Sequence, residues 1–239
     1  MPPKFGVVIF PGSNCDHDLL HVFGTVLDQR VEELWHKRAD GLADYDPAAD
    51  TVLVPGGFSY GDYLRAGALA RFSPIMRSVI EFAGRGGRVI GICNGFQILC
   101  EAELLPGALL RNERQKFICD NVYLRAATPD SDLTRDLDGA RAYRIPIAHA
   151  EGRYYASEAV LDELEAADQV LFRYVDAAGE ATAAANPNGS ARNIAGVCNA
   201  GRNVLGMMPH PERAAEPILG NDDGLAMLAS VVAARAEAL

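Results

Sequence analysis

Short apolar runs alternate with helix-like patterns through the first hundred residues of the chain. The apolar runs cover residues 5–10, 51–55 and 88–92, and the helix-like patterns cover residues 18–27, 74–83 and 95–102. Such alternation is typical of β-α-β units, in which parallel strands are covered by crossover helices. We therefore expect an α/β fold with an open, mostly parallel sheet and helices on both faces. Ligands bind such sheets at the carboxyl ends of the strands.

The second half of the chain has a different pattern. It contains hairpin-like runs at residues 169–175 and 182–185, a turn at 186–189, and further apolar runs at 194–198 and 204–208. Closely spaced runs separated by Asn, Pro and Gly indicate antiparallel pairing, so we expect a smaller antiparallel sheet here. The Ala-rich tail at 224–239 has a helical pattern. No linker divides the chain, and we expect one domain over residues 1–239.

One cysteine lies between a strand pattern and a helix pattern, with a glycine two residues away on each side. Gly91-Ile-Cys-Asn-Gly95 has the spacing of a nucleophile elbow, the thiol counterpart of G-x-S-x-G. The nucleophile of an elbow has a strained backbone that only nearby glycines tolerate. A helix that begins at Asn94 would favour the thiolate of Cys93 and direct N–H groups at a developing oxyanion. The pattern predicts acyl transfer through a thioester on Cys93.

A nucleophilic thiol needs a base and a group that orients the base, and two H-x-E pairs could supply them. His210-Pro-Glu212 follows an apolar run at 203–209, and His149-Ala-Glu151 has the same spacing. In extended backbone, residues two apart project to the same side, so the glutamate could orient the imidazole. Spacing alone does not choose between the pairs. We expect the smaller antiparallel sheet to carry the base.

Two further features near the elbow each have a functional and a structural interpretation. Gly56-Gly57 follows the strand-like run at 51–55, and it is either an oxyanion donor or a tight turn. Gln97 lies one turn into the predicted elbow helix, and it is either a substrate contact or an amide on the helix surface. Neither pattern decides between its two interpretations.

Other cysteine, histidine and aspartate residues are assigned structural roles. Cys15, His17 and His21 fit a metal site poorly, because the chain lacks H-E-x-x-H and clear Cys or carboxylate ligand spacing, so we expect no metal. Asp16 or Asp18 is expected to cap a helix. The remaining cysteines are expected to be buried, reduced and apolar in role: Cys100, Cys119 and Cys198.

Composition excludes several classes of protein. The chain has 22 basic and 32 acidic residues, a net charge of −10, which argues against a nucleic-acid surface because Lys and Arg make most phosphate contacts. No apolar run reaches the roughly 18 residues of a membrane helix, and the N-terminus lacks a signal-peptide pattern. Five scattered cysteines form no disulfide framework, so we expect a cytoplasmic protein. Phosphate-loop and dinucleotide motifs are missing, so we expect neither ATP nor another cofactor in this chain.

Four longer stretches make a family resemblance specific. The elbow and His210-Pro-Glu212 resemble those of the class I (triad) glutamine amidotransferases, whose fold is an open α/β sheet. The resemblance narrows to the glutaminase subunits of phosphoribosylformylglycinamidine synthases, and nearly the whole chain shares it. The stretches that carry it are residues 10–16, 55–65, 111–119 and 207–213. No physical role for residues 59–65 follows from the sequence alone.

The resemblance implies the roles of individual residues. Cys93, His210 and Glu212 correspond to the triad, which favours this pair over His149 and Glu151. The backbone N–H groups of Gly57 and Asn94 correspond to the oxyanion donors, and Gln97 to a contact with bound glutamine.

The resemblance also implies a reaction and a partner. Glutamine would be hydrolysed to glutamate and ammonia, and the ammonia would pass to a large synthetase subunit that holds ATP and Mg²⁺, in a complex with a small accessory subunit. That complex converts formylglycinamide ribonucleotide to formylglycinamidine ribonucleotide in purine biosynthesis. Because ammonia would otherwise be lost to water, we expect a docking face near Cys93. The alternatives are a stand-alone cysteine hydrolase or peptidase and a non-catalytic interaction subunit.

Overall fold

The residues of the computed structural model fall into two compact units. The structure describes residues 2–237. Of the described residues, the first unit comprises 2–105, 203–206 and 232–237, and the second comprises 106–202 and 207–231. Whether the chain behaves as the single domain expected from the sequence stays a prediction.

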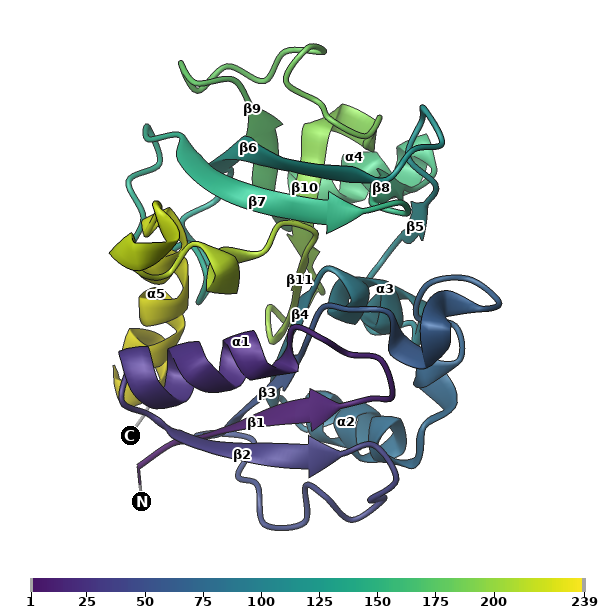
Figure 1. The fold of residues 1–239 in the computed structure, drawn as a ribbon, viewed down its shortest axis with the longest axis vertical. Coiled ribbons are helices and arrows are strands. Elements are labelled where there is room, and N and C mark those ends of the chain that lie inside the picture. The colour runs from purple at the N-terminus through teal and green to yellow at the C-terminus, as the bar shows by residue number, and fades with distance from the viewer. Residues whose placement is uncertain (1, 238–239) are drawn as a thin grey trace. The chain divides into compact units, whose positions relative to one another are not determined.

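The first unit is built on parallel strands. The strand order is β2 (Arg30–Trp35), β1 (Lys4–Ile9), β3 (Thr51–Val54), β4 (Arg88–Ile92), with β11 (Val204–Met207) beside β4. The pairs β1–β2, β1–β3 and β3–β4 are parallel, and Figure 1 shows β1 and β2 side by side. All four residues of β3 are buried, as are most of β1 and β4. Strands covered on both faces require such continuous apolar runs.

The helices of the first unit follow the predicted alternation. They are α1 (Asp16–His21), which continues into a wider π-helical turn over Val22–Val26, α2 (Pro74–Gly84) and α3 (Asn94–Glu101). Helix α2 buries one face through residues at 75, 76, 79, 82 and 83, the spacing of an amphipathic helix. Short 3-10 turns cover Ser59–Asp62 and Ala70–Phe72.

The predicted capping role of Asp16 or Asp18 is wrong. Cys15 occupies the N-cap position of α1 and makes no capping side-chain bond, while both aspartates lie inside the helix. The carboxylate of Asp16 accepts hydrogen bonds from its neighbour His17 N–H at 2.8 Å and from Ser13 Oγ at 3.1 Å instead. The helix therefore begins earlier than the periodicity indicated.

The second unit contains antiparallel strands in the order β10 (Ile194–Cys198), β9 (Val170–Val175), β6 (Ile118–Ala126), β7 (Tyr143–His149). The separate small antiparallel sheet pairs β5 (Ala108–Leu110) with β8 (Arg153–Tyr155). Figure 1 shows β6 and β7 as two long neighbouring ribbons. Helix α4 (Glu158–Ala166) is capped by Ser157, whose side chain accepts the Val160 N–H. The chain continues into α5 (Asp223–Glu237), which confirms the helical tail as far as the described residues reach.

One predicted hairpin is wrong. Residues 183–185 form a turn and Thr182 has no regular structure, while β9 pairs with β10 and β6. The Ala185 N–H bonds to the carbonyl and hydroxyl oxygens of Thr182, a local arrangement that competes with strand pairing. The alanines of this segment also offer little apolar surface to bury.

Among the described helices, none combines the length and the apolar character needed to cross a membrane.

Candidate active site

Cys93 has the strained backbone predicted for an elbow nucleophile. It lies between β4 and α3 with φ +50° and ψ −105°, a backbone conformation that residues other than glycine rarely adopt. Such strain costs of order 1–3 kcal/mol and persists only where the surroundings impose it. An added Cβ at Gly91 would lie 2.6 Å from Leu99 Cδ1, and one at Gly95 would collide with the carbonyl oxygen of Val54. Both glycines are therefore required by close packing of β3, β4 and α3.

Gly57 also has a conformation that only glycine adopts easily. Its φ is +134°, and an added Cβ would lie 2.6 Å from Asn14 N and 2.7 Å from Ser13 Cα. Gly57 follows β3 and Asn94 follows β4, the parallel neighbour of β3. Because the carboxyl ends of parallel neighbours meet at one edge of the sheet, both predicted oxyanion donors belong to that edge.

Gln97 is not an amide on the helix surface. Its side chain is 5% exposed, and Oε1 accepts a hydrogen bond from Asn94 Nδ2 at 2.9 Å. Every residue of α3 from Asn94 to Cys100 is buried. The interpretation of Gln97 as a solvated residue is therefore wrong, and its contact with glutamine stays a prediction.

Residues 59–65, which had no physical role at the level of sequence, are held along the length of α3. The Ser59 N–H donates to Asn94 Oδ1 at 3.0 Å, and Arg65 forms a bidentate ion pair with Glu101 at 2.6 Å. An added Cβ at Gly67 would lie 2.7 Å from the backbone nitrogen of Ile98. The segment is thus bonded to the start and the end of the helix that begins at the nucleophile, and Gly67, just after it, packs closely against the middle.

Tyr60 fixes the same segment on its other side. Its hydroxyl lies 2.7 Å from His36 Nδ1 and 2.8 Å from Ser73 Oγ, and its N–H donates to the Pro11 carbonyl at 2.7 Å. Tyr60 has φ +53°, so these contacts hold a left-handed turn in place. The pKa of His36 is lowered, first by burial and then by the nearby Lys37.

His210 and Glu212 form a buried pair in the second unit. His210 Nδ1 lies 2.6 Å from Glu212 Oε1, and the two residues are 1% and 2% exposed. The His210 N–H donates to the Pro146 carbonyl of β7 at 2.9 Å. The expected geometry was wrong, because a 3-10 turn over Pro211–Arg213, rather than extended backbone on an antiparallel sheet, brings the two side chains together.

The rival histidine and glutamate have separate partners. His149 Nδ1 lies 3.0 Å from Asn112 Oδ1, while Glu151 pairs with Arg111 at 3.5 Å. Asn112 Oδ1 also accepts the Gly152 N–H at 3.0 Å, so this amide oxygen faces His149 and the imidazole must donate from Nδ1. Burial, with His210 nearby, lowers the pKa of His149 to about 4. His149 is therefore a neutral histidine of fixed tautomer at neutral pH.

The structure places the predicted catalytic residues in different parts of the chain. Cys93, Gly57, Asn94 and Gln97 belong to the first unit, and His210 with Glu212 belongs to the second. The grouping of Cys93 with His210 and Glu212 as one triad stays a prediction. The side-chain roles of Asn94 and Asn112 were missed, because lone asparagines carry no pattern that predicts which backbone groups they bind.

One cysteine prediction is wrong. Cys100 and Cys198 are buried, whereas Cys119 is exposed, because the first half of β6 has a solvent-facing surface. Burial raises the pKa of the Cys100 thiol, and burial also raises the pKa of Cys198, although the nearby Arg202 partly opposes that rise. Both thiols are thereby kept protonated and unreactive.

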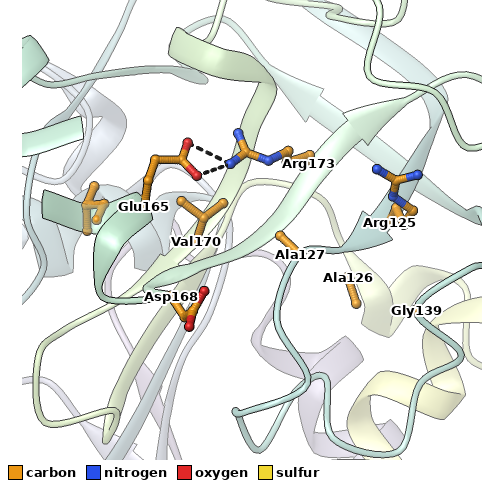
Figure 2. A pocket seen from close by; sticks show the side chains of 9 residues that line it. Arg125, Ala126, Ala127, Gly139, Glu165, Asp168, Val170 and Arg173 are labelled. Carbon is orange, nitrogen blue, oxygen red and sulfur yellow. Dashed lines mark hydrogen bonds and ion pairs between the residues drawn. The ribbon is translucent and has the colours of Figure 1, made fainter. Parts of the chain in front are cut away.

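A separate pocket of about 320 Å³ lies in the second unit and contains none of the predicted catalytic residues. Figure 2 shows Arg173 bonded to both carboxylate oxygens of Glu165, with Arg125 apart from this pair. The pairing neutralises one of the two arginines that line the pocket.

Comparison with known proteins places the chain in a family. Residues 2–222 match the model of the CobB/CobQ-like glutamine amidotransferase domain. The chain belongs to this family. Its glutamine amidotransferase fold is confirmed by PurLQS from Thermotoga maritima, with a TM-score of 0.82 at 40% identity over 98% of this chain and 99% of the other.

Two curated relatives of this glutamine amidotransferase match nearly its whole length. Phosphoribosylformylglycinamidine synthase subunit PurQ of Koribacter versatilis is 56% identical over 98% of this chain and 99% of its own. The subunit of the same name from Salinibacter ruber is 54% identical over 97% of each chain. The resemblance stated from the sequence motifs is therefore confirmed.

Proposed function

We propose that the chain is the glutaminase subunit of a phosphoribosylformylglycinamidine synthase. The observation that carries the chemistry is the strained Cys93 elbow, with φ +50° imposed by close packing at Gly91 and Gly95. The full-length identity of 54–56% to subunits named PurQ supports the choice of synthase.

The reaction begins with attack of the Cys93 thiolate on the side-chain amide carbon of glutamine. A tetrahedral intermediate forms, and its oxyanion accepts hydrogen bonds from the Gly57 and Asn94 N–H groups. His210, oriented by Glu212, donates a proton to the departing nitrogen, so that ammonia leaves and a glutamyl thioester remains. His210 then takes a proton from water, which attacks the thioester carbon, so that glutamate is released and the Cys93 thiolate and the protonated His210 are restored.

The ammonia is used by a partner. Conversion of an amide to an amidine requires that the amide oxygen be activated and removed, a step for which ATP and Mg²⁺ serve in the large synthetase subunit. This chain contributes ammonia and no cofactor, and it acts in the cytoplasm with the synthetase and a small accessory subunit. The similarity to PurLQS of Thermotoga maritima supports a complex of this kind.

The test is to mix the purified chain with glutamine and follow glutamate release, with and without the synthetase subunits and their nucleotide substrates. Glutamate release that rises on addition of the synthetase supports the proposal. Peptide cleavage by the chain alone, without glutaminase activity in the complex, would establish a stand-alone hydrolase instead. A complex that uses ammonium salts but never glutamine would establish a non-catalytic subunit.

A further inference from the structure

One amide side chain connects the nucleophile helix to residues 59–62. Asn94, 1% exposed, accepts the Ser59 N–H at Oδ1, 3.0 Å away. Its Nδ2 donates to Gln97 Oε1 at 2.9 Å and lies 3.3 Å from Asp62 Oδ1. A backbone N–H can only donate, so the oxygen end of Asn94 must face Ser59 and the nitrogen end must face Gln97 and Asp62.

This connection bears on the predicted oxyanion donor at Gly57, two residues before Ser59. On its other side the same loop is held by the residues after β1, since the Phe58 N–H donates to Gly12 at 2.9 Å and the Tyr60 N–H to Pro11 at 2.7 Å. These bonds tie the loop to the loop that follows β1. Through the Ser59 N–H, the Asn94 side chain links this loop to α3.

The connection also sets the orientation of Gln97. Because Asn94 presents an N–H donor, the Gln97 atom that faces it is the carbonyl oxygen Oε1. The Asn94 side chain therefore fixes which end of the Gln97 amide faces the start of α3.

We propose that the Asn94 side chain is a positioning residue that holds the Gly57 loop against the nucleophile helix and fixes the orientation of the Gln97 amide. The proposal rests on the proposed glutaminase function. It is distinct from the backbone role of Asn94, because substitution of the side chain leaves the Asn94 N–H in place.

The test compares Asn94→Leu, of similar size but without hydrogen bonds, and Asn94→Ala with Arg65→Ala, which removes a different tether of the same segment. Each full-length variant is assembled with the synthetase subunits, and competent sites are counted by alkylation with 6-diazo-5-oxo-L-norleucine. Both Asn94 variants should retain a full titre, lose about 10- to 100-fold in kcat per titrated site and show a raised KM for glutamine. Arg65→Ala should stay within about three-fold of wild type in both constants.

Amide hydrogen exchange gives a second measurement that does not depend on activity. Exchange at Ser59 should rise at least about ten-fold in both Asn94 variants, because the loss of this bond leaves its N–H without the Asn94 acceptor. Unchanged exchange at Ser59, or a lower titre with unchanged kcat per site, overturns the proposal. An equal loss of kcat in Arg65→Ala also overturns it, because loosening the segment anywhere would then suffice.

The same experiment separates this proposal from the function on which it rests. A wild-type complex that releases no glutamate overturns the proposed function and, with it, the catalytic meaning of the Asn94 contact. An active wild type with Asn94 variants that keep their kcat overturns the positioning proposal alone.

Discussion

The Cys93 thiol is the group on which the proposed chemistry depends. We expect Cys93→Ser to lower glutamate release in the complex by at least about 10³-fold, because a serine hydroxyl ionises far less readily than a thiol and is a weaker nucleophile. Assays of glutamate with the synthetase present would measure this. The matched control is Cys119→Ser, an exposed thiol on β6, which should keep full activity. Equal loss in both variants would contradict the role of Cys93.

His149 should contribute an acid-sensitive part of the stability. Its pKa in the folded state is about 4, lowered first by burial, while that of an unfolded histidine is about 6.5. As pH falls from 6.5 to 4, the unfolded chain takes up a proton that the folded chain does not, so the free energy of unfolding falls, by up to about 3 kcal/mol. The contribution is fully present above pH 6.5.

Urea unfolding of the wild type and of His149→Gln at pH 7.5 and pH 4.5 would measure this contribution. The wild type should lose more stability between the two pH values than the variant does. An identical loss in both would show that His149 is protonated in the folded protein as readily as in the unfolded one.

The roles of some single residues could be predicted from the sequence and those of others could not. The Gly91, Cys93 and Gly95 spacing signalled an elbow because its steric demand is local, and the structure shows the strain at Cys93. The two H-x-E pairs were indistinguishable in sequence, since nothing local shows that Asn112 engages His149. Long-range hydrogen bonds of this kind depend on the packed fold rather than on neighbours in the chain.

At the level of elements, parallel strands and crossover helices were more predictable than loops and turns. Strands β1, β3 and β4 are buried on both faces, so their apolar runs identified them directly. Residues 182–185 were mistaken for a strand, because the local bonds of the Ala185 N–H to the carbonyl and hydroxyl of Thr182 leave no pattern in the sequence. The segment at 59–65 had no periodicity, because its conformation is determined by contacts with α3 and His36.

The elbow between β4 and α3 should gain stability when its strain is relieved. Cys93→Gly removes the Cβ at φ +50°, so we expect it to raise the free energy of unfolding by about 1 kcal/mol relative to Cys93→Ala, which keeps the strain. Both variants should be inactive. Chemical denaturation of the two proteins side by side would measure the difference. A glycine variant less stable than the alanine variant would show that the surroundings do not impose strain on this turn.

At the scale of the whole molecule, the family match over residues 2–222 spans both compact units, so neither unit alone represents the family. The motifs that carried the resemblance are likewise distributed between them. Residues 55–65 belong to the first unit and residues 111–119 to the second. Motifs dispersed along the sequence are therefore enough to identify the family. The 3-10 turn that pairs His210 with Glu212 is seen only in the structure.

The proposed division of labour between this chain and its partner predicts a specific pattern of rescue. A complex assembled with Cys93→Ala should make no amidine product from glutamine, because the thioester cannot form. The same complex should make product at near wild-type rates from a high concentration of ammonium salt at alkaline pH, where free ammonia replaces the missing supply. Assays of ADP and nucleotide product with each nitrogen source would measure both activities. Loss of the ammonia-dependent activity in Cys93→Ala would mean that the thiol also supports the synthetase reaction. That result would contradict the proposal that the catalytic contribution of this chain ends at the release of ammonia.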